Sequence, residues 1–198
     1  AVARAAVKGA QGAPVLLANR TRSKAEAVAR ELGAQTADNE TVARECSLIF
    51  LGVKPQMMEQ MLSGLVPILK ARKDRFVLVS MAAALTIPDL RERGCRDWPL
   101  IRIMPNTPSA IGEGVIFYTC DGVTAEEEAA FLENMAGAGR LLPLDDHLMD
   151  AGSAVAGCGP AFVDLFIEAM ADGGVACGLT RPMAMECAAQ TLIGAARL

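Results

Sequence analysis

Apolar residues gather in short runs along the first half of the chain, and segments with helical spacing separate the runs. Four of these runs have the length of strands and do not alternate with polar residues: Val15–Ala18, Leu48–Val53, Phe76–Met81 and Leu100–Met104. Strands without alternation are buried on both faces, as in a parallel sheet that helices cover on each side. The pattern therefore predicts an α/β fold with a doubly wound parallel sheet.

Helix-start signals fall between these strands. Ala1–Lys8 has the pattern of the end of a helix, and Gly9 marks its stop. Ser23 and Glu26 have the spacing of a capping box and predict that a helix begins there. Asn39 is a candidate cap for the next helix. Thr86 and Thr124 are candidate caps for two later helices, in TIPDL and TAEEEAAFLENM.

The pattern changes towards the end of the chain. Val115–Cys120 and Leu141–Leu144 are two further strand candidates, but no strand is predicted after Leu148. Three helices are predicted instead, over Met149–Ala156, Pro160–Val175 and Pro182–Leu198. We therefore predict a sheet domain over residues 1–146 and an all-helical domain over residues 147–198. The helical part is short for a domain that must bury its own core.

Composition and charge exclude some classes of protein. The chain has 198 residues, of which 52% are hydrophobic and 4% aromatic, and its net charge is -4. This balance excludes a disordered chain and argues against nucleic-acid binding, which favours a basic face. No run approaches about 18 uncharged apolar residues, so no membrane span is predicted. The six cysteines lack CxxC spacing, which predicts reduced thiols and a cytoplasmic protein.

Metal and hydrolase chemistry find little support in the sequence. Asp164, Glu168 and Asp172 recur every four residues, but they have no histidine or second acidic cluster nearby, so a solvated or subunit-facing stripe is favoured. His147 is interpreted as a surface residue. GxSxG, HExxH and Walker lysine motifs are absent from the sequence. No metal site is predicted.

The residues after the first strand bear on cofactor choice. Ligands of open α/β sheets bind at the carboxyl ends of the strands, and NAD-dependent folds usually have an acidic residue after this strand. Here Asn19, Arg20 and Thr21 offer donors instead, and Arg20 can form charge-assisted bonds to a 2′-phosphate. The alternative is a solvated turn before the next helix.

Three other strand ends carry candidate cofactor residues. Lys54 and Pro55, which follow Val53, predict an extended corner that can present backbone groups to a ribose or nicotinamide. The small side chains of Ala82–Ala84 would let a flat ligand approach closely. Asn106, between two prolines, is suited to orienting a carboxamide, although a purely structural turn explains it equally well.

A glycine-rich string precedes the second of the late helices. Gly157, Cys158 and Gly159 stand directly before Pro160. If the helix begins here, free backbone N–H groups could face an anion such as a substrate carboxylate. The start of the helix alone also explains the pattern.

Six strings, in this order, resemble the pyrroline-5-carboxylate reductase family: VKPQ, SMAAALT, RIMPNTP, AGCGPAF, FIEAMADGGVACGL and AAQTLIGAARL. The resemblance extends over nearly the whole chain. It implies a Rossmann-like NAD(P)-binding domain and a helical domain that pairs with a second copy, giving a homodimer or a higher homo-oligomer. It also implies the last step of proline biosynthesis, in which NADPH or NADH reduces 1-pyrroline-5-carboxylate to L-proline in the cytoplasm.

The resemblance also implies roles for individual residues. It assigns the adenosine side of the cofactor, with NADPH favoured, to Asn19, Arg20, Thr21 and Asn39. It assigns the ribose and nicotinamide side to Val53, Lys54, Pro55, Ala82, Ala83 and Asn106. Two positions depart from the family pattern, because Ala84 replaces a common glycine and Cys158 a common serine.

No catalytic residue is assigned. Hydride transfer to a protonated imine needs mainly orientation and electrostatic support from the protein. The resemblance leads us to expect that a first strand with its glycine-rich loop precedes this sequence and that a substrate-binding turn follows it. The alternative functions are another NAD(P)-dependent dehydrogenase on the same scaffold and a non-catalytic dimerising protein. The helix from Pro160 lacks the lysine or histidine that such a dehydrogenase would carry.

Overall fold

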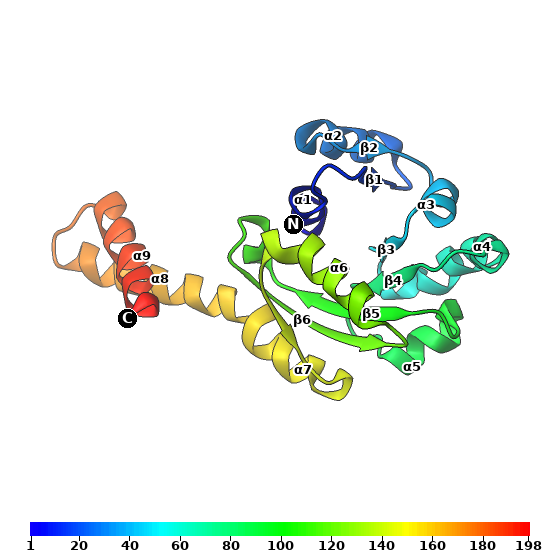
Figure 1. Ribbon diagram of the computed structural model, residues 1–198. Helices are drawn as coiled ribbons and strands as arrows, with labels where there is room; N and C mark the ends of the chain where they lie inside the picture. Colours follow the sequence, from blue (N-terminus) through cyan, green and yellow to red (C-terminus); the bar gives the residue numbers. More distant parts are fainter. The chain divides into compact units, whose positions relative to one another are not determined.

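The computed structural model describes residues 1–198 and contains two compact units, Ala1–Ser153 and Ala154–Leu198. The first unit holds every strand, and the second is helical (Figure 1). The predicted domain boundary, after residue 146, lies inside the first unit. The cysteines are all free thiols.

The main sheet has five strands in the order β3-β4-β5-β6-β7. Their bounds are Leu48–Leu51, Val77–Ser80, Leu100–Pro105, Gly114–Asp121 and Gly139–Pro143. β3, β4 and β5 are parallel to one another, as predicted, but β6 runs antiparallel to β5. Only residues 106–113 connect these two strands, and such a short link cannot make the crossover that a parallel pair needs. β7 is again parallel to β6.

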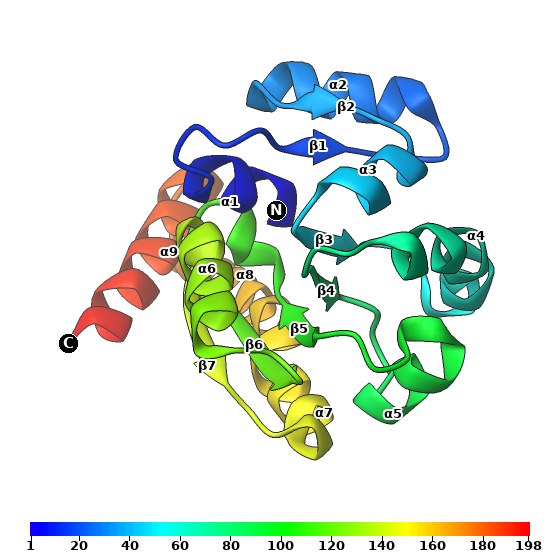
Figure 2. The same cartoon turned by 45° about the vertical axis from the view of Figure 1, so that its right-hand side comes forward.

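A second, two-stranded sheet contains β1 (Leu16–Leu17) and β2 (Gln35–Thr36), which are parallel. It is not hydrogen-bonded to the five-stranded sheet. In Figures 1 and 2 it lies on the β3 side of that sheet. Only two residues of the predicted Val15–Ala18 strand therefore pair.

Helices cover both faces of the main sheet, which confirms the doubly wound prediction. The helices of this unit are α1 (Val2–Gly9), α2 (Arg22–Leu32), α3 (Asn39–Glu45), α4 (Met58–Ala71), α5 (Ile87–Leu90), α6 (Ala125–Met135) and α7 (Met149–Gly152). On one face, Leu62 of α4 and Leu90 of α5 join Leu78 of the sheet in a buried cluster. On the other face, Ala5 of α1 and Phe131 of α6 pack with strand residues.

Two of the four predicted helix caps are confirmed. Thr86 and Thr124 each form a capping box, in which the threonine side chain and a carboxylate three residues later bond each other's backbone N–H. Ser23 lies inside α2, whose N-cap is Thr21, so the predicted cap is two residues too late. Asn39 is the first residue of α3, because the side chain of Asp38 accepts the capping bond from Thr41.

Glycines allow two close backbone approaches in this unit. A Cβ on Gly9 of α1 would lie 2.2 Å from the carbonyl oxygen of Asn134 in α6. Gly114 and Gly139 pair across β6 and β7, where a Cβ on Gly139 would lie 2.2 Å from the oxygen of Gly114. A Cβ on Gly114 would in turn collide with the side chain of Ser109. Backbone packs directly on backbone at both places.

The second unit contains α8 (Gly159–Ala176) and α9 (Arg181–Arg197). Only three of its alanines are buried, Ala171, Ala184 and Ala188. Large apolar side chains along both helices are exposed, and the largest are Phe162 and Phe166, with exposed fractions of 66% and 55%. This unit leaves most of its apolar surface uncovered by its own residues.

One helical run bears on the expectation that the chain has no membrane span. Helical segments follow one another from Asp146 to Ala176 with a turn at Cys158, and an 18-residue stretch within this run has a mean hydropathy of 1.5 and is 6% buried. The run is therefore long and apolar enough, by length and composition, to cross a membrane. The sequence criterion counted only uncharged runs, whereas this measure of hydropathy admits up to two charged residues, so the two give different results for the same segment.

Candidate functional site

The candidate site lies at the carboxyl ends of the parallel strands. β3, β4 and β5 are neighbours that run in one direction, so the segments after them, which begin at Gly52, Met81 and Asn106, leave the same edge of the sheet. This brings the predicted corner at Lys54, the alanines after β4 and Asn106 to one edge. The arrangement is the usual ligand-binding edge of an open α/β sheet.

The segment after β1 is a compact exposed turn. The side-chain Oδ1 of Asn19 accepts a hydrogen bond of 2.9 Å from the backbone N–H of Thr21, the N-cap of α2. Asn19, Arg20 and Thr21 are all exposed. The Asn19 oxygen thus shapes the turn, and the Arg20 guanidinium makes no ion pair within the chain. No acidic residue stands between Ala18 and Ala25, so this turn presents positive charge.

Asn39 follows the other strand of the small sheet. It is exposed at the first position of α3, and Asp38 beside it caps that helix. The bond from Thr41 to the Asp38 carboxylate lowers the pKa of that group, so the cap keeps its negative charge. The side chain of Asn39 is not needed for the cap.

The corner after β3 has the backbone that its sequence predicted. Lys54 is extended, with φ -63° and ψ 148°, because Pro55 disfavours the helical conformation of the residue before it. The Lys54 carbonyl accepts from the N–H of Met57, which closes a 3-10 turn over Pro55–Met57. Lys54 is exposed, whereas Val53 packs against the apolar cluster of Leu62 and its neighbours.

The alanine loop after β4 holds a residue in an unusual conformation. Ala82 is buried and its N–H donates to the Oγ of the buried Ser80 over 3.3 Å, while Ala83 is exposed. Ala84 has a φ of 61°, in the left-handed region that favours glycine. The departure from the family pattern at this position therefore has a physical cost, because an alanine occupies a backbone conformation that suits glycine.

Asn106 closes the loop between β5 and β6. Its Oδ1 accepts from the backbone N–H of Val115 over 3.0 Å and from the hydroxyl of Ser109 over 3.4 Å. Both donors belong to the same hairpin, so this oxygen is used to hold the loop in shape. The structural interpretation of Asn106 thus has direct support, and its position at the carboxyl edge remains compatible with a cofactor role.

α8 begins at Gly159, next to the predicted start at Pro160, but no non-helical segment precedes it at Gly157 and Cys158. Ser153–Gly157 is a turn of π-helix, and Cys158 has helical angles immediately before α8. The backbone therefore stays helical where a free helix start was expected. Wide π-helical turns occur often at functional sites. Cys158 is exposed, and its thiol occupies the position at which the resemblance implies a serine.

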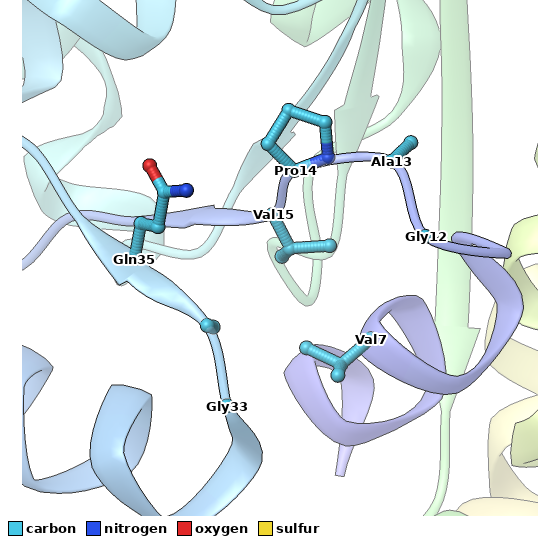
Figure 3. A pocket seen from close by; sticks show the side chains of 8 residues that line it. Val7, Gly12, Ala13, Pro14, Val15, Gly33 and Gln35 are labelled. Atoms are coloured by element: carbon cyan, nitrogen blue, oxygen red, sulfur yellow. The ribbon is translucent and has the colours of Figure 1, made fainter.

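Two hollows in the first unit lie away from these residues. One, of about 290 Å³, is bounded by α1, the segment before β1 and the turn between α2 and β2, with Val7 and Val15 facing each other (Figure 3). It opens at the amino ends of β1 and β2, opposite the edge that follows them. The other, of about 360 Å³, includes Tyr118, whose hydroxyl donates to Glu128, and Cys120. None of the predicted cofactor residues lines either hollow.

The sequence interpretation missed a buried polar group in the sheet. Arg102 of β5 is 2% exposed, and its Nη1 lies 2.7 Å from the Oδ1 of Asp146. Arg102 pairs in register with Ser80, whose hydroxyl accepts from the alanine loop. A charged residue inside the apolar run LIRIM was the signal that could have identified it.

Comparison with known families gives two matches that together cover both ends of the chain. Residues 146–198 match the model of pyrroline-5-carboxylate reductase dimerisation. Residues 1–84 match the model described as NADP oxidoreductase coenzyme F420-dependent. The fold class of a Rossmann-like NADP-binding domain followed by a helical dimerisation domain is thereby confirmed.

Individual relatives agree with these models. The chain is 39% identical to the pyrroline-5-carboxylate reductase of Glycine max over 161 residues, and 39% identical to that of Pisum sativum over 163 residues. These alignments cover 81% and 82% of the chain, but only 57% and 58% of the relatives. The chain thus matches somewhat more than half the length of these curated relatives.

Solved structures of the same family superpose closely. The pyrroline-5-carboxylate reductase of Coxiella burnetii has a TM-score of 0.89 at 27% identity, covering 99% of this chain and 75% of that one. The Plasmodium falciparum pyrroline carboxylate reductase with NADP bound has a TM-score of 0.83 at 26% identity, covering 99% and 72%. Taken with the sequence matches, these likenesses support the resemblance of the chain to the pyrroline-5-carboxylate reductase family.

Proposed function

We propose that this protein is an oxidoreductase that reduces 1-pyrroline-5-carboxylate to L-proline by hydride transfer from NADPH. The observation that carries the proposal is the 39% identity, over four fifths of the chain, to relatives named for this reaction. Imine reductases and a reductive aminase with 20–21% identity share only the fold with it. The proposal places the protein at the last step of proline biosynthesis.

The turn after β1 supports the phosphorylated cofactor. Arg20 is an exposed cation without an ion-pair partner, and no acidic side chain adjoins it in the turn. A 2′-phosphate gains charge-assisted hydrogen bonds from such a group, whereas NAD would find no carboxylate there for its 2′-hydroxyl. The residues fit NADPH better than NADH. We assign the adenosine phosphate to Arg20 with Asn19 and Thr21, and the adenosine to Asn39.

The edge of the main sheet supports the rest of the cofactor. Ala82 and Ala83 carry only methyl groups, so a flat ring can approach the backbone after β4 closely. Val53–Pro55 and Asn106 would bound the ribose and nicotinamide, with Lys54 extended and Asn106 fixed by its bond from Val115. When bound, NADPH supplies the hydride. The residues of this edge bind and orient the cofactor, and they exclude water from the reacting face of its nicotinamide.

The substrate side is assigned to Gly157, Cys158 and Gly159. Glycines there let a small carboxylate approach the main chain, and the Cys158 thiol offers a weaker donor than the hydroxyl common in the family. The imine carbon is already electrophilic when its nitrogen is protonated. The protein's part is therefore to hold the carboxylate and the ring in one orientation rather than to form a covalent bond.

A second copy of the chain is the proposed partner of the helical unit. The exposed apolar residues of α8 and α9, among them Phe162, Leu165, Phe166 and Met183, are too many for a lone soluble unit. The match to a dimerisation model over residues 146–198 favours a protein partner over a lipid one for this surface. We propose a homodimer or higher homo-oligomer in the cytoplasm, without nucleic acid or membrane as a partner.

The assay that tests the reaction is proline formation from 1-pyrroline-5-carboxylate by the full-length gene product, with NADPH and NADH in separate series. We expect turnover with a lower KM for NADPH. No turnover with either cofactor would refute the proposed reaction. Light scattering after size-exclusion chromatography without detergent tests the assembly, and a stable monomer there would refute the homodimer.

Cofactor choice is tested with a matched pair of arginine variants. Arg20→Ala should raise the KM for NADPH by about tenfold or more while changing that for NADH little, because a charge-assisted bond is worth about 1.5–3 kcal/mol. Arg22→Ala is the control, because Arg22 is also exposed but is paired with Glu26. Equal losses for both cofactors in Arg20→Ala would show that Arg20 does not contact the 2′-phosphate.

A further inference from the structure

The loop Met81–Thr86, which carries Ala82 and Ala83, is held at both ends by side chains. At its start, the Ser80 hydroxyl accepts from the N–H of Ala82. At its end, Thr86 forms the capping box of α5 with Asp89. One more bond fixes this end: the N–H of Ile87, the residue after Thr86, donates to the Oδ2 of Asp146 over 3.0 Å. Asp146 is 59 residues away in sequence.

The same carboxylate binds the buried arginine of β5. The other oxygen of Asp146 accepts from Nη1 of Arg102 over 2.7 Å, and the Asp146 carbonyl lies 3.3 Å from the same nitrogen. The side chain of Asp146 is thus shared between a sheet residue and the end of the loop. Arg102 also pairs in register with Ser80 across the sheet, so it neighbours the start of the Met81–Thr86 segment through the strand pairing and its end through Asp146.

Burying the charged side chain of Arg102 at this position costs solvation free energy. It is 2% exposed, and its Nε is buried without a hydrogen-bond partner. A buried ion pair commonly contributes little net stability compared with apolar residues of the same volume. A contribution to stability therefore does not explain the Arg102–Asp146 pair well. A role in fixing the position of the Met81–Thr86 loop does.

We propose that Asp146 is a positioning residue that, held by Arg102, fixes the end of the Met81–Thr86 loop for binding of the nicotinamide cofactor. The proposal rests on the cofactor assignment made above. Its content is separate from that assignment, because it concerns residues that do not touch the cofactor themselves. Asp146 acts through the backbone of Ile87, and Arg102 acts through Asp146.

Paired double variants test this proposal while avoiding a buried unpaired charge. Removing only Asp146 would leave Arg102 uncompensated and could unfold the protein. Arg102→Met with Asp146→Asn removes both charges and keeps a carbonyl that can accept from Ile87. Arg102→Met with Asp146→Ala removes both charges and the acceptor. The two proteins therefore differ at one acceptor group.

The readouts are amide hydrogen exchange at Ile87 and the NADPH dissociation constant measured by calorimetry on the full-length protein. We expect exchange at Ile87 to be roughly tenfold faster, and NADPH binding roughly fivefold to tenfold weaker, in the alanine double variant than in the asparagine one, the size of one lost hydrogen bond. Asp121→Asn, which removes the charge from the Arg91–Asp121 pair beside the amino end of β5, should leave both quantities unchanged.

Equal exchange and equal NADPH binding in the two double variants would overturn the proposal. Faster exchange with unchanged binding would also overturn it, because the bond would then be structural only. A wild-type protein that binds NADPH but does not reduce pyrroline-5-carboxylate would contradict the proposed reaction and leave this comparison valid. A wild-type protein that binds no NADPH would overturn both.

Discussion

Replacing Ala84 with glycine should stabilise the protein. The left-handed conformation at φ 61° costs an alanine about 1–2 kcal/mol, and glycine adopts it without that cost. Glycine also gives the unfolded chain more conformational entropy than alanine does, and this lowers the free energy of unfolding by about 0.4–1 kcal/mol. The net expectation for Ala84→Gly is a rise of about 0.5–1 kcal/mol in the free energy of unfolding, or about 1–4 °C in Tm for a protein of this size.

The neighbouring Ala83 supplies the matched control. It is exposed in the same loop but does not have a positive φ. Ala83→Gly should therefore lower the free energy of unfolding by about 0.4–1 kcal/mol, through the greater entropy of the unfolded chain alone. Urea unfolding followed by the fluorescence of Trp98, the single tryptophan, reports on the first unit, because this ring packs 5.6 Å from Phe76. Protein concentration is kept equal throughout. If Ala84→Gly destabilised the protein as much as Ala83→Gly, the strain assigned to Ala84 would be refuted.

Two further predictions concern the packing and the chemistry of the first unit. Gly9→Ala should lower the free energy of unfolding by about 1–3 kcal/mol, because the new methyl group meets the backbone of α6. The control is Gly64→Ala, in open space on α4, which should raise the free energy of unfolding by up to about 1 kcal/mol. Equal effects of the two substitutions in urea unfolding would contradict the close approach at Gly9. Burial raises the pKa of Cys120 from 9.0 to about 12, so its thiolate population at pH 8 is about a thousandfold smaller. Iodoacetamide should therefore modify Cys120 far more slowly in the native protein than in urea, as peptide mass spectrometry would show, and rates within tenfold of each other would contradict that shift.

Local signals in the sequence predicted much of the fold. The capping boxes at Thr86 and Thr124 span only three residues, so their partners are visible in the sequence itself. Buried strands are also recognisable, because their apolar residues follow one another without alternating with polar ones. Ser23 and Asn39 failed as caps since a better or earlier candidate, Thr21 or Asp38, stands one or two residues before each.

Long-range features could not be predicted in the same way. The reversal of β6 depends on the closed loop that Asn106 makes with Val115, and a proline-flanked asparagine alone does not reveal that partner. The bond between Arg102 and Asp146 joins residues 44 apart in sequence, and only the fold brings them together. The strain at Ala84 likewise became visible only as a backbone angle.

The direct backbone packing at Gly114 and Gly139 gives the candidate site one stiff wall. Where glycines remove the side chains between β6, β7 and the loop at Ser109, no rotamer can adjust to absorb a displacement. The turn after β1 follows a strand of only two paired residues and has no such support. With the cofactor placed as proposed above, a bound dinucleotide would meet a rigid template at its nicotinamide end and a compliant one at its adenosine end. A change in preference between NADPH and NADH should accordingly evolve more readily than acceptance of a cofactor with a ring other than nicotinamide.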